Sequence, residues 1–294
     1  MYHSPVLLTE SVDALNIKPD GVYVDVTFGG GGHSKEILTR LGNGKLIAFD
    51  QDPEAKANAL NDDRFVLMPY NFMHMKNWLT MLGHTHVDGI LADLGVSSHQ
   101  FDSHGRGFSI RFDATLDMRM DMQRELNAAR VVNTYEEDKL LYVLRNYGEV
   151  DRAWHIVQNI VRARPVNTTA QLIEILKKYQ RHGKEHKLAA QVFQALRIEV
   201  NGEMDALKQL LMQSVEVLAK GGRLSVISYH SLEDRLVKDF MKTGNFEGDP
   251  QKDFYGNLLR PLKPLHSKPI VPAAEEIQQN NRARSAKLRI AEKL

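Results

Sequence analysis

Four consecutive glycines, Gly29–Gly32, follow a short apolar segment and limit the local backbone more than any other feature of this chain. Residues 21–27 have the pattern of a buried strand, and residues 33–41 have that of a helix, which Gly42 and Gly44 close. Glycine adopts positive φ angles and lets the backbone approach a ligand, at a cost in backbone entropy. The run therefore predicts a ligand-binding turn, with a tight turn and helix caps as the alternative.

Short apolar strands alternate with helices in the first third of the chain. Further strands are predicted over residues 45–50, 64–68 and 87–93, and a helix over residues 53–60 with Asp52 as its N-cap. This alternation predicts an α/β fold with a parallel sheet that is covered on both faces. The glycine turn would lie at the carboxyl edge of that sheet, where ligands bind.

The alternation stops after the fourth predicted strand. Residues 98–122 are predicted to form a structured loop, and helices are predicted over residues 136–147, 152–164, 169–179, 187–201 and 203–218. Gly221 and Gly222 are expected to end the last helix, before strands over residues 223–228 and 286–291. The simplest organisation is one α/β domain, residues 1–101 and 204–294, interrupted by a helical insertion, residues 102–203.

Composition narrows the class of protein. The chain has 294 residues and no cysteine, which excludes disulfide scaffolds, thiolate zinc sites and cysteine nucleophiles. It shows neither an apolar run of membrane-spanning length nor a signal peptide, so a cytoplasmic protein is expected. Residues 151–201 hold nine Lys/Arg against four Asp/Glu, and residues 255–294 hold eight against three, so each stretch carries +5. Such stretches suit a polyanionic ligand, although solvated helix faces give the same counts.

Two acidic residues accompany the glycine turn. Asp25 ends the first predicted strand, where its charge would repel a pyrophosphate and attract a ligand with an ammonium group. Asp50 ends the second, at the distance from the turn where an acidic residue accepts hydrogen bonds from ribose hydroxyls. Together they favour S-adenosylmethionine over a nicotinamide dinucleotide.

Asp93 ends the fourth predicted strand, next to the first strand in the usual doubly wound order. There it would face the reactive end of the cofactor and accept N–H bonds from a nucleobase amine; the alternative is that it caps the next turn. Because the chain has no cysteine, the covalent route to pyrimidine C5 methylation is closed. An exocyclic amine or a hydroxyl remains as the methyl acceptor.

Other polar groups fit weaker hypotheses. His84 and His86 have no third partner at ligand spacing, so no metal site is expected. Ser231 is predicted to cap a helix with Asp234 at its third position, and His230 is a candidate for lining the acceptor pocket. Arginines and aspartates alternate over residues 106–121, a pattern that fits both the ordering of a loop and an RNA-facing gate.

Several strings of residues, spread along nearly the whole chain, resemble the sequence pattern of one family. The most specific are Asp93-Leu-Gly-Val-Ser-Ser-x-Gln100, Leu116-Asp-Met-Arg-Met-Asp121 and His230-Ser-Leu-Glu-Asp-Arg235, taken together. The string Asp25-x-Thr-x-Gly-Gly-Gly-Gly-His-Ser34 is less specific by itself, and a further string begins at His3. They resemble the MraW/RsmH family of S-adenosylmethionine-dependent small-subunit ribosomal RNA (cytosine-N4)-methyltransferases.

The resemblance implies a class I Rossmann-like methyltransferase sheet and an insertion that recognises RNA. It implies a partner, small-subunit (16S) ribosomal RNA or the assembling subunit, and methylation of one cytosine in the decoding region. From their positions in the sequence, the candidate catalytic residues are Asp93 and, as the weaker candidate, His230. Asp25 is expected at the cofactor from its charge, and the resemblance implies cofactor contacts at Gly31, Gly32, His33, Asp50, Phe72 (near the adenine), Asp93 and Gln100.

The chain departs from the family pattern at a few positions. Tyr229 stands where the family often has phenylalanine, and His99 stands where it often has proline; Val150 and residues 186–189 also differ. Phe108 and Tyr229 are candidates for a ring that stacks on the target base, with a core role as the alternative. Two rival functions remain: an RNA-binding assembly protein with a vestigial nucleotide pocket, and an NAD-dependent oxidoreductase. The sequence leaves the oligomeric state open, and a homodimer is one of the alternatives.

Overall fold

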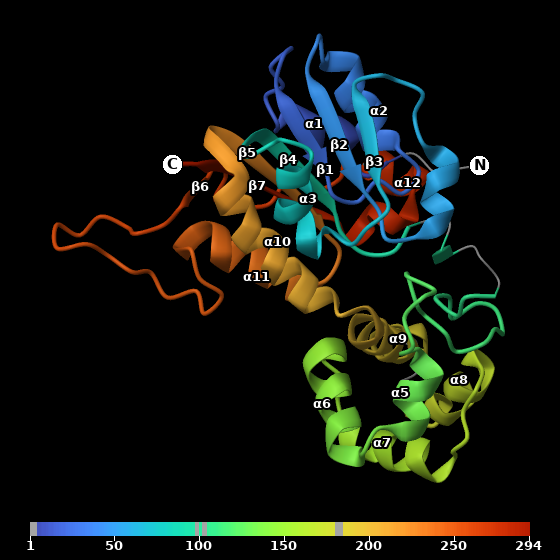
Figure 1. Ribbon diagram of the computed structural model, residues 1–294. Helices are drawn as coiled ribbons and strands as arrows, with labels where there is room; N and C mark the ends of the chain where they lie inside the picture. The colour runs from blue at the N-terminus through green and yellow to red at the C-terminus, as the bar shows by residue number, and fades with distance from the viewer. Residues whose placement is uncertain (1–4, 98–99, 102–104, 180–184) are drawn as a thin grey trace. The chain divides into compact units, whose positions relative to one another are not determined.

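The computed structural model describes residues 5–97, 100–101, 105–179 and 185–294, which form two compact units. The sheet unit comprises residues 1–95 and 204–294, and the helical unit comprises residues 96–203 (Figure 1). The helical unit thus begins six residues before the insertion boundary expected from sequence. Of the earlier predictions, His3, Ser98, His99 and part of the loop over residues 98–122 lie outside the described residues.

In the described part of the sheet unit, seven strands form one sheet with the order β3-β2-β1-β4-β5-β7-β6. Strands β1 to β5 pair in parallel, whereas β7 is antiparallel to both β5 and β6. The predicted α/β fold is confirmed, and β1 to β5 are parallel as predicted, whereas the antiparallel β6 and β7 make the sheet mixed. The strands are β1 (Val22–Asp25), β2 (Lys45–Phe49), β3 (Phe65–Met68), β4 (Val87–Asp93), β5 (Leu218–Ser228), β6 (Leu262–Pro264) and β7 (Lys287–Lys293).

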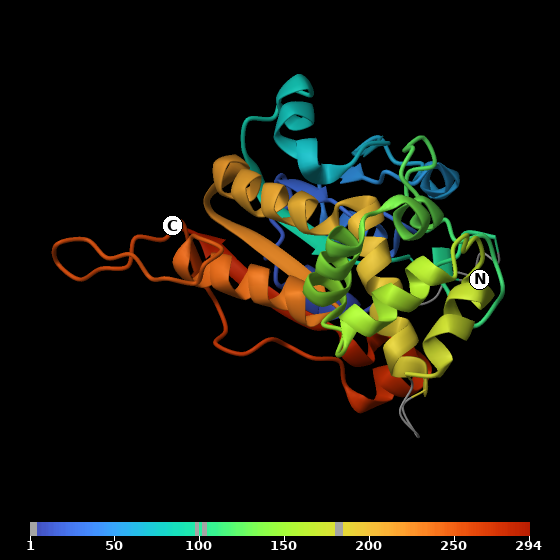
Figure 2. The same ribbon diagram turned by 90° about the horizontal axis from the view of Figure 1, so that it is seen from below.

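Successive strand residues pack against different helices, because side chains alternate between the two faces of a sheet. Val24, Ile47 and Ile90 belong to the core beneath α3 (Met75–Met81), α10 (Glu203–Val217) and α11 (Ser231–Thr243). Their neighbours Tyr23 and Leu46 pack against α1 (Leu8–Asp13) and α2 (Gly32–Arg40). Both faces are therefore buried, and Figure 2 shows α10 and α11 lying along the sheet.

Shorter helical segments connect these elements. They are the 3₁₀ turns η1 (Pro53–Asn58), η2 (Phe72–His74) and η3 (Asn281–Ser285), and the helix α12 (Ala274–Gln279). The predicted cap of η1 is confirmed, since the Asp52 side chain accepts a hydrogen bond from the Glu54 amide and Pro53 stands at the first position. Among the described residues, no helix has the length and apolar composition needed to cross a membrane.

In the last third of the chain, one prediction needs correction and one strand was not predicted. The glycines 221 and 222 do not end a helix: α10 stops at Val217, and both glycines lie inside β5, where its register against β4 shifts. Gly221 has a φ of 78°, a value that glycine adopts readily, and so lets the strand bulge there. Strand β6 was not predicted, because it is three residues long and ends in Pro264; proline is tolerated there because β6 is the edge strand.

Five helices surround one apolar core in the described part of the helical unit. They are α5 (Ala128–Thr134), α6 (Glu137–Gly148), α7 (Ala153–Arg162), α8 (Thr169–Lys177) and α9 (Glu185–Asn201) (Figure 1). Helix α5 was not predicted, whereas the other four follow the predicted ranges to within two residues at each end. Thr168 and Gln171 form a capping box at the start of α8, which fixes where that helix begins.

Candidate cofactor site and active site

The glycine turn connects β1 to α2 with two glycines in the left-handed region. Gly31 is the N-cap of α2 with a φ of 75°, and a Cβ atom there would come within 2.9 Å of the Phe28 ring. Gly29 has a φ of 51°, and its amide donates a hydrogen bond of 2.7 Å to Oδ2 of Asp50. The first intrahelical bond runs from Lys35 to Gly31, so the amides of Gly32, His33 and Ser34 precede it. Glycine at position 31 therefore lets the turn pack directly against Phe28. This turn and the amides at the start of α2 are called the glycine cradle below.

Asp25 lies beneath this turn and orders it. Its side chain has 0% exposed surface and accepts hydrogen bonds from the Thr27 amide (3.1 Å) and the Ser34 hydroxyl (2.7 Å). Burial raises the pKa of Asp25, and the His33 side chain opposes that rise. The predicted contact between Asp25 and a ligand ammonium therefore needs correction, since the carboxylate is enclosed and already bonded to the turn.

Asp50 directly follows β2 and faces the glycine turn. Its Oδ1 accepts a hydrogen bond from the Asp52 amide at 2.8 Å, in addition to the Gly29 contact on Oδ2. Burial raises the pKa of Asp50 to about 6, although these two amides favour the charged form. Each carboxylate oxygen has two lone pairs, so both keep acceptor capacity for the hydroxyls of a ribose.

Asp93 is held by three neighbouring elements at the carboxyl end of β4. Its amide donates a hydrogen bond of 2.6 Å to Oγ1 of Thr27, in the turn after β1. Oδ1 accepts a hydrogen bond of 2.7 Å from the Tyr229 hydroxyl, and Oδ2 lies 3.9 Å from Nδ1 of His33. The side chain keeps 23% of its surface exposed, so it can contact a ligand. Burial raises the pKa of Asp93 to about 6, against the effects of His33 and Tyr229.

The two predicted histidines have structural contacts of their own. His33 is buried in the first turn of α2, and its Nε2 lies 3.1 Å from the carbonyl oxygen of Val6. His230 is the N-cap of α11: its Nδ1 accepts a hydrogen bond from the Glu233 amide, and its Nε2 lies 3.2 Å from Oε1 of the same residue. The predicted cap at Ser231 is therefore wrong by one residue, because an imidazole nitrogen takes the capping role.

The remaining predicted cofactor residues lie on two different units. Phe72 begins η2, and its ring is half-buried against the core beneath α3. The side chain of Asn71 donates a hydrogen bond of 2.7 Å to that of Gln51, which ties this turn to the residue after Asp50. Gln100 belongs to the helical unit, where its Oε1 accepts a hydrogen bond from the Ser97 amide. The predicted contact of Gln100 with the cofactor stays a prediction.

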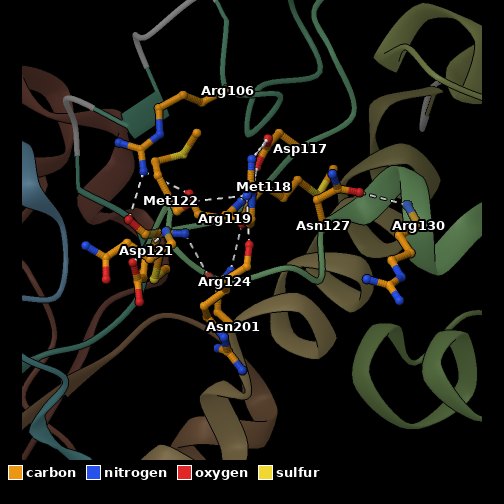
Figure 3. A network of polar contacts seen from close by, with 12 residues as sticks. Arg106, Asp117, Met118, Arg119, Asp121, Met122, Arg124, Asn127, Arg130 and Asn201 are labelled. Carbon is orange, nitrogen blue, oxygen red and sulfur yellow. Dashed lines mark hydrogen bonds and ion pairs between the residues drawn. The ribbon is translucent and has the colours of Figure 1, made fainter.

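Arginine and aspartate side chains from the alternating stretch hold a loop of the helical unit in place (Figure 3). Arg119 forms a two-pronged ion pair with Asp117 and donates to the carbonyl oxygens of Met122 and Arg124. Arg106 donates to the carbonyl oxygens of Arg119 and Met120. These contacts give both side chains a structural role, whereas Arg111 is exposed and stays a candidate for RNA contact.

Three residues of the site carried no signal specific enough to predict their roles. Thr27 and Ser34 are small hydroxyl residues of the turn, and their bonds depend on strands and helices folding against one another. Tyr229 was considered only as a stacking ring, yet its hydroxyl bonds to Asp93, 136 positions away in the chain. Phe108, the other stacking candidate, is buried in the core of the helical unit.

The strand order, the antiparallel β7, the glycine cradle after β1 and the acidic residues after β2 and β4 together define a class I Rossmann-like methyltransferase. S-adenosylmethionine is the methyl donor of this class, and the acceptors of Asp50 and the amides at the start of α2 fit such a molecule. Comparison with known proteins narrows the class further. The chain matches the MraW methylase family over residues 1–294 and belongs to it.

Several relatives are similar over their full length. The ribosomal RNA small subunit methyltransferase H of Flavobacterium johnsoniae is 62% identical, with 100% of this chain and 98% of the relative covered. The protein of the same name from Cytophaga hutchinsonii is 58% identical over 100% of both chains. That from Bacteroides fragilis is 55% identical over 99% of this chain and 97% of the relative.

Proposed function

We propose that this methyltransferase transfers a methyl group from S-adenosylmethionine to the N4 amino group of one cytosine in the decoding region of small-subunit ribosomal RNA. The observation that carries the proposal is the placement of Asp93, a partly exposed carboxylate at the carboxyl end of β4 beside the glycine cradle. The full-length similarity to proteins named ribosomal RNA small subunit methyltransferase H supports the RNA substrate. A protein that acts on ribosomal RNA belongs in the cytoplasm of a bacterium.

Residues of the sheet unit would bind the nucleoside part of the cofactor. Asp50 would accept hydrogen bonds from the ribose hydroxyls, and the ring of Phe72, in the turn that Asn71 ties to Gln51, would contact the adenine. The amides of Gly32 and His33, at the start of α2, would bind the part of S-adenosylmethionine that lies beyond the nucleoside.

The chemistry supplied by the bound cofactor is an electrophilic methyl group on a sulfonium. The amino group of cytosine is a weak nucleophile, because its lone pair is delocalised into the ring. Asp93 accepts an N–H bond from this group, which directs the lone pair and favours pyramidal nitrogen. Above pH 6 the carboxylate is mostly ionised and able to accept. The nitrogen then loses one proton, to solvent or to a nearby carboxylate.

The helical unit would bind the RNA. It presents many exposed cations, which suit the phosphates of an RNA and give binding that weakens with salt. These residues are Arg111, Arg130, Lys139, Arg145, Arg152, Arg162, Lys177, Lys178 and Lys187. Arg119 and Arg106 contribute indirectly, because their contacts fix the loop over residues 106–124.

The position of the transferred methyl group tests the proposal. Small-subunit RNA from a strain that lacks this gene is incubated with the protein and isotopically labelled S-adenosylmethionine, digested to nucleosides and analysed by mass spectrometry. We expect N4-methylcytidine from one site in the decoding region. Label at carbon 5 of a pyrimidine, at a ribose or at no position would contradict the proposal. So would a second measurement, in which NAD raises the melting temperature of the protein and S-adenosylmethionine does not.

A further inference from the structure

The hydroxyl of Tyr229 meets the carboxylate of Asp93 at the carboxyl edge of the sheet. Tyr229 is the first residue after β5, and Asp93 is the last residue of the neighbouring strand β4. The hydroxyl donates a hydrogen bond of 2.7 Å to Oδ1 of Asp93. An O–H to carboxylate bond of this length is of the charge-assisted kind, which is stronger than a bond between neutral groups.

The rest of the Tyr229 residue is fixed from three sides. Its amide donates a hydrogen bond of 2.9 Å to Oε2 of Glu233, within the capping box of α11. Its ring packs against the apolar cluster that contains Ile227 and Leu288. The backbone at Gly95, with a φ of 97°, passes so close that a Cβ there would lie 3.4 Å from Cδ2 of the ring. The hydroxyl is thus presented to Asp93 by a rigid support.

Several charged or titratable groups face this pair from different elements. His33 of α2 lies 3.9 Å from Oδ2 of Asp93 and attracts it when protonated. Asp25 of β1 and Glu233 of α11 act on Asp93 in the opposite sense, since like charges disfavour ionisation. Beyond Asp93 itself, the groups that face Tyr229 are Glu233 and Glu276 of α12.

We propose that Tyr229 is a positioning residue, whose hydroxyl holds the Asp93 carboxylate in one orientation and in its ionised form for the amine acceptor. The proposal rests on the proposed function of Asp93 in methyl transfer. With Oδ1 bound to Tyr229 and the amide bound to Thr27, the carboxylate has one orientation in which Oδ2 is left to meet a substrate N–H. A phenylalanine would keep the ring and release this constraint.

The electrostatic consequence has a definite sign. Burial raises the pKa of Asp93 to about 6, and the Tyr229 hydrogen bond opposes that rise. Without the hydroxyl the pKa of Asp93 is expected to rise further, by about one pH unit for a charge-assisted hydrogen bond. Tyr229 itself remains a hydrogen-bond donor over the whole pH range of the measurements, because burial and the Asp93 charge raise its pKa well above 10.

The test is the Tyr229→Phe variant of the full chain, with Tyr255→Phe as the matched control. The control removes the same hydroxyl from Tyr255, a residue that is 86% exposed. The pKa of the Asp93 carboxyl is read by carbon-13 NMR with labelled aspartate, a measurement that needs no methyl transfer. We expect it to rise by about one unit in Tyr229→Phe and to stay unchanged in Tyr255→Phe.

The pH profile of methyl transfer gives the second readout. For Tyr229→Phe we expect the acidic limb to move up by the same amount, so that the rate falls about fivefold more at pH 6 than at pH 8.5, where only the loss of orientation acts. The KM for S-adenosylmethionine should stay constant. An unchanged Asp93 pKa, or an equal loss at every pH, would overturn the proposal. If the wild-type protein transfers no methyl group, the proposed function fails, while the NMR titration still decides the Tyr229 interaction.

Discussion

Oγ1 of Thr27 accepts a hydrogen bond of 2.6 Å from the backbone amide of Asp93, and so joins the glycine turn to the carboxyl end of β4. Thr27 is itself bound to Asp25 through its amide. The turn that would hold the cofactor and the carboxylate that would meet the methyl acceptor are therefore parts of one hydrogen-bonded network. Substitutions in the turn should therefore alter the position of Asp93 even when they make no contact with it.

Replacing Thr27 with valine tests this network, because valine keeps the shape and removes the acceptor. The Asp93 amide would lose its partner in a partly buried site, so we expect the free energy of unfolding to fall by about 1–2 kcal/mol. Methyl transfer should also slow, since the backbone at Asp93 is released. Thr27→Ser, which keeps the hydroxyl, is the control. Equal stability and rate in both variants, measured by denaturant unfolding and initial rates, would show that the bond has no such role.

Gly31→Ala tests whether the cradle requires glycine. Both Gly31 and Gly83 have positive φ, 75° and 82°, so alanine at either position should cost about 1 kcal/mol of backbone strain. Only at Gly31 would the new Cβ meet a neighbour, the Phe28 ring at 2.9 Å, whereas nothing lies within 4 Å at Gly83. We expect Gly31→Ala to lose more stability and, by calorimetry, to bind S-adenosylmethionine more weakly. Comparable affinity in the two variants would refute a cofactor role for the turn.

The stability of the protein should depend on pH through Asp93. Its pKa is about 6 in the folded protein and near 3.8 in an unfolded chain, so the folded state binds the proton more tightly. The free energy of unfolding should therefore fall as the pH rises from about 4 to about 6.

Asp93→Asn removes this effect, and its amide can still accept from Tyr229 while facing His33 with the NH₂ group. We expect the variant to be more stable than the wild type by about 1–3 kcal/mol at pH 7.5 and by a smaller margin at pH 5. Thermal unfolding at the two pH values measures the difference. A variant that is less stable at pH 7.5 would contradict the raised pKa.

Arg119→Lys separates loop ordering from RNA contact in the helical unit. Lysine keeps the charge and loses the paired bonds to Asp117 and the bonds to two carbonyl oxygens (Figure 3). We expect a loss of about 1–3 kcal/mol in stability and faster hydrogen exchange in the loop. Arg111→Ala, at an exposed position, should leave stability unchanged and weaken RNA binding in a salt-dependent way. The reverse pattern would assign Arg119 to the phosphates.

The sequence predicted those features of the fold that depend on local pattern. Apolar strands, the glycine turn and the acidic residue at each strand end are all visible within a few residues, so the positions of Asp50 and Asp93 at one edge of the sheet could be anticipated. Strand β6 was missed because three residues ending in Pro264 carry no periodic signal. The cap of α11 was misplaced because serine is the commoner capping residue, while the structure uses His230.

The contacts that define the site could not be predicted in the same way. Whether Asp25 faces a ligand or the interior depends on how the turn packs, and the structure encloses it. The bond between Tyr229 and Asp93 depends on β4 and β5 being neighbours, although more than a hundred residues of the chain separate them. Sequence reasoning could name the residues of the edge but not their pairing.

The most direct test of the account is the methyl transfer rate of Asp93→Asn, at pH 7.5 and with S-adenosylmethionine at saturation. Asp63→Asn removes the same charge from an exposed residue of the sheet unit and is the control. We predict that Asp93→Asn, folded and stable, methylates small-subunit ribosomal RNA at least about a hundredfold more slowly than the wild type, while Asp63→Asn is unaffected. Near-normal production of N4-methylcytidine by Asp93→Asn would contradict the account.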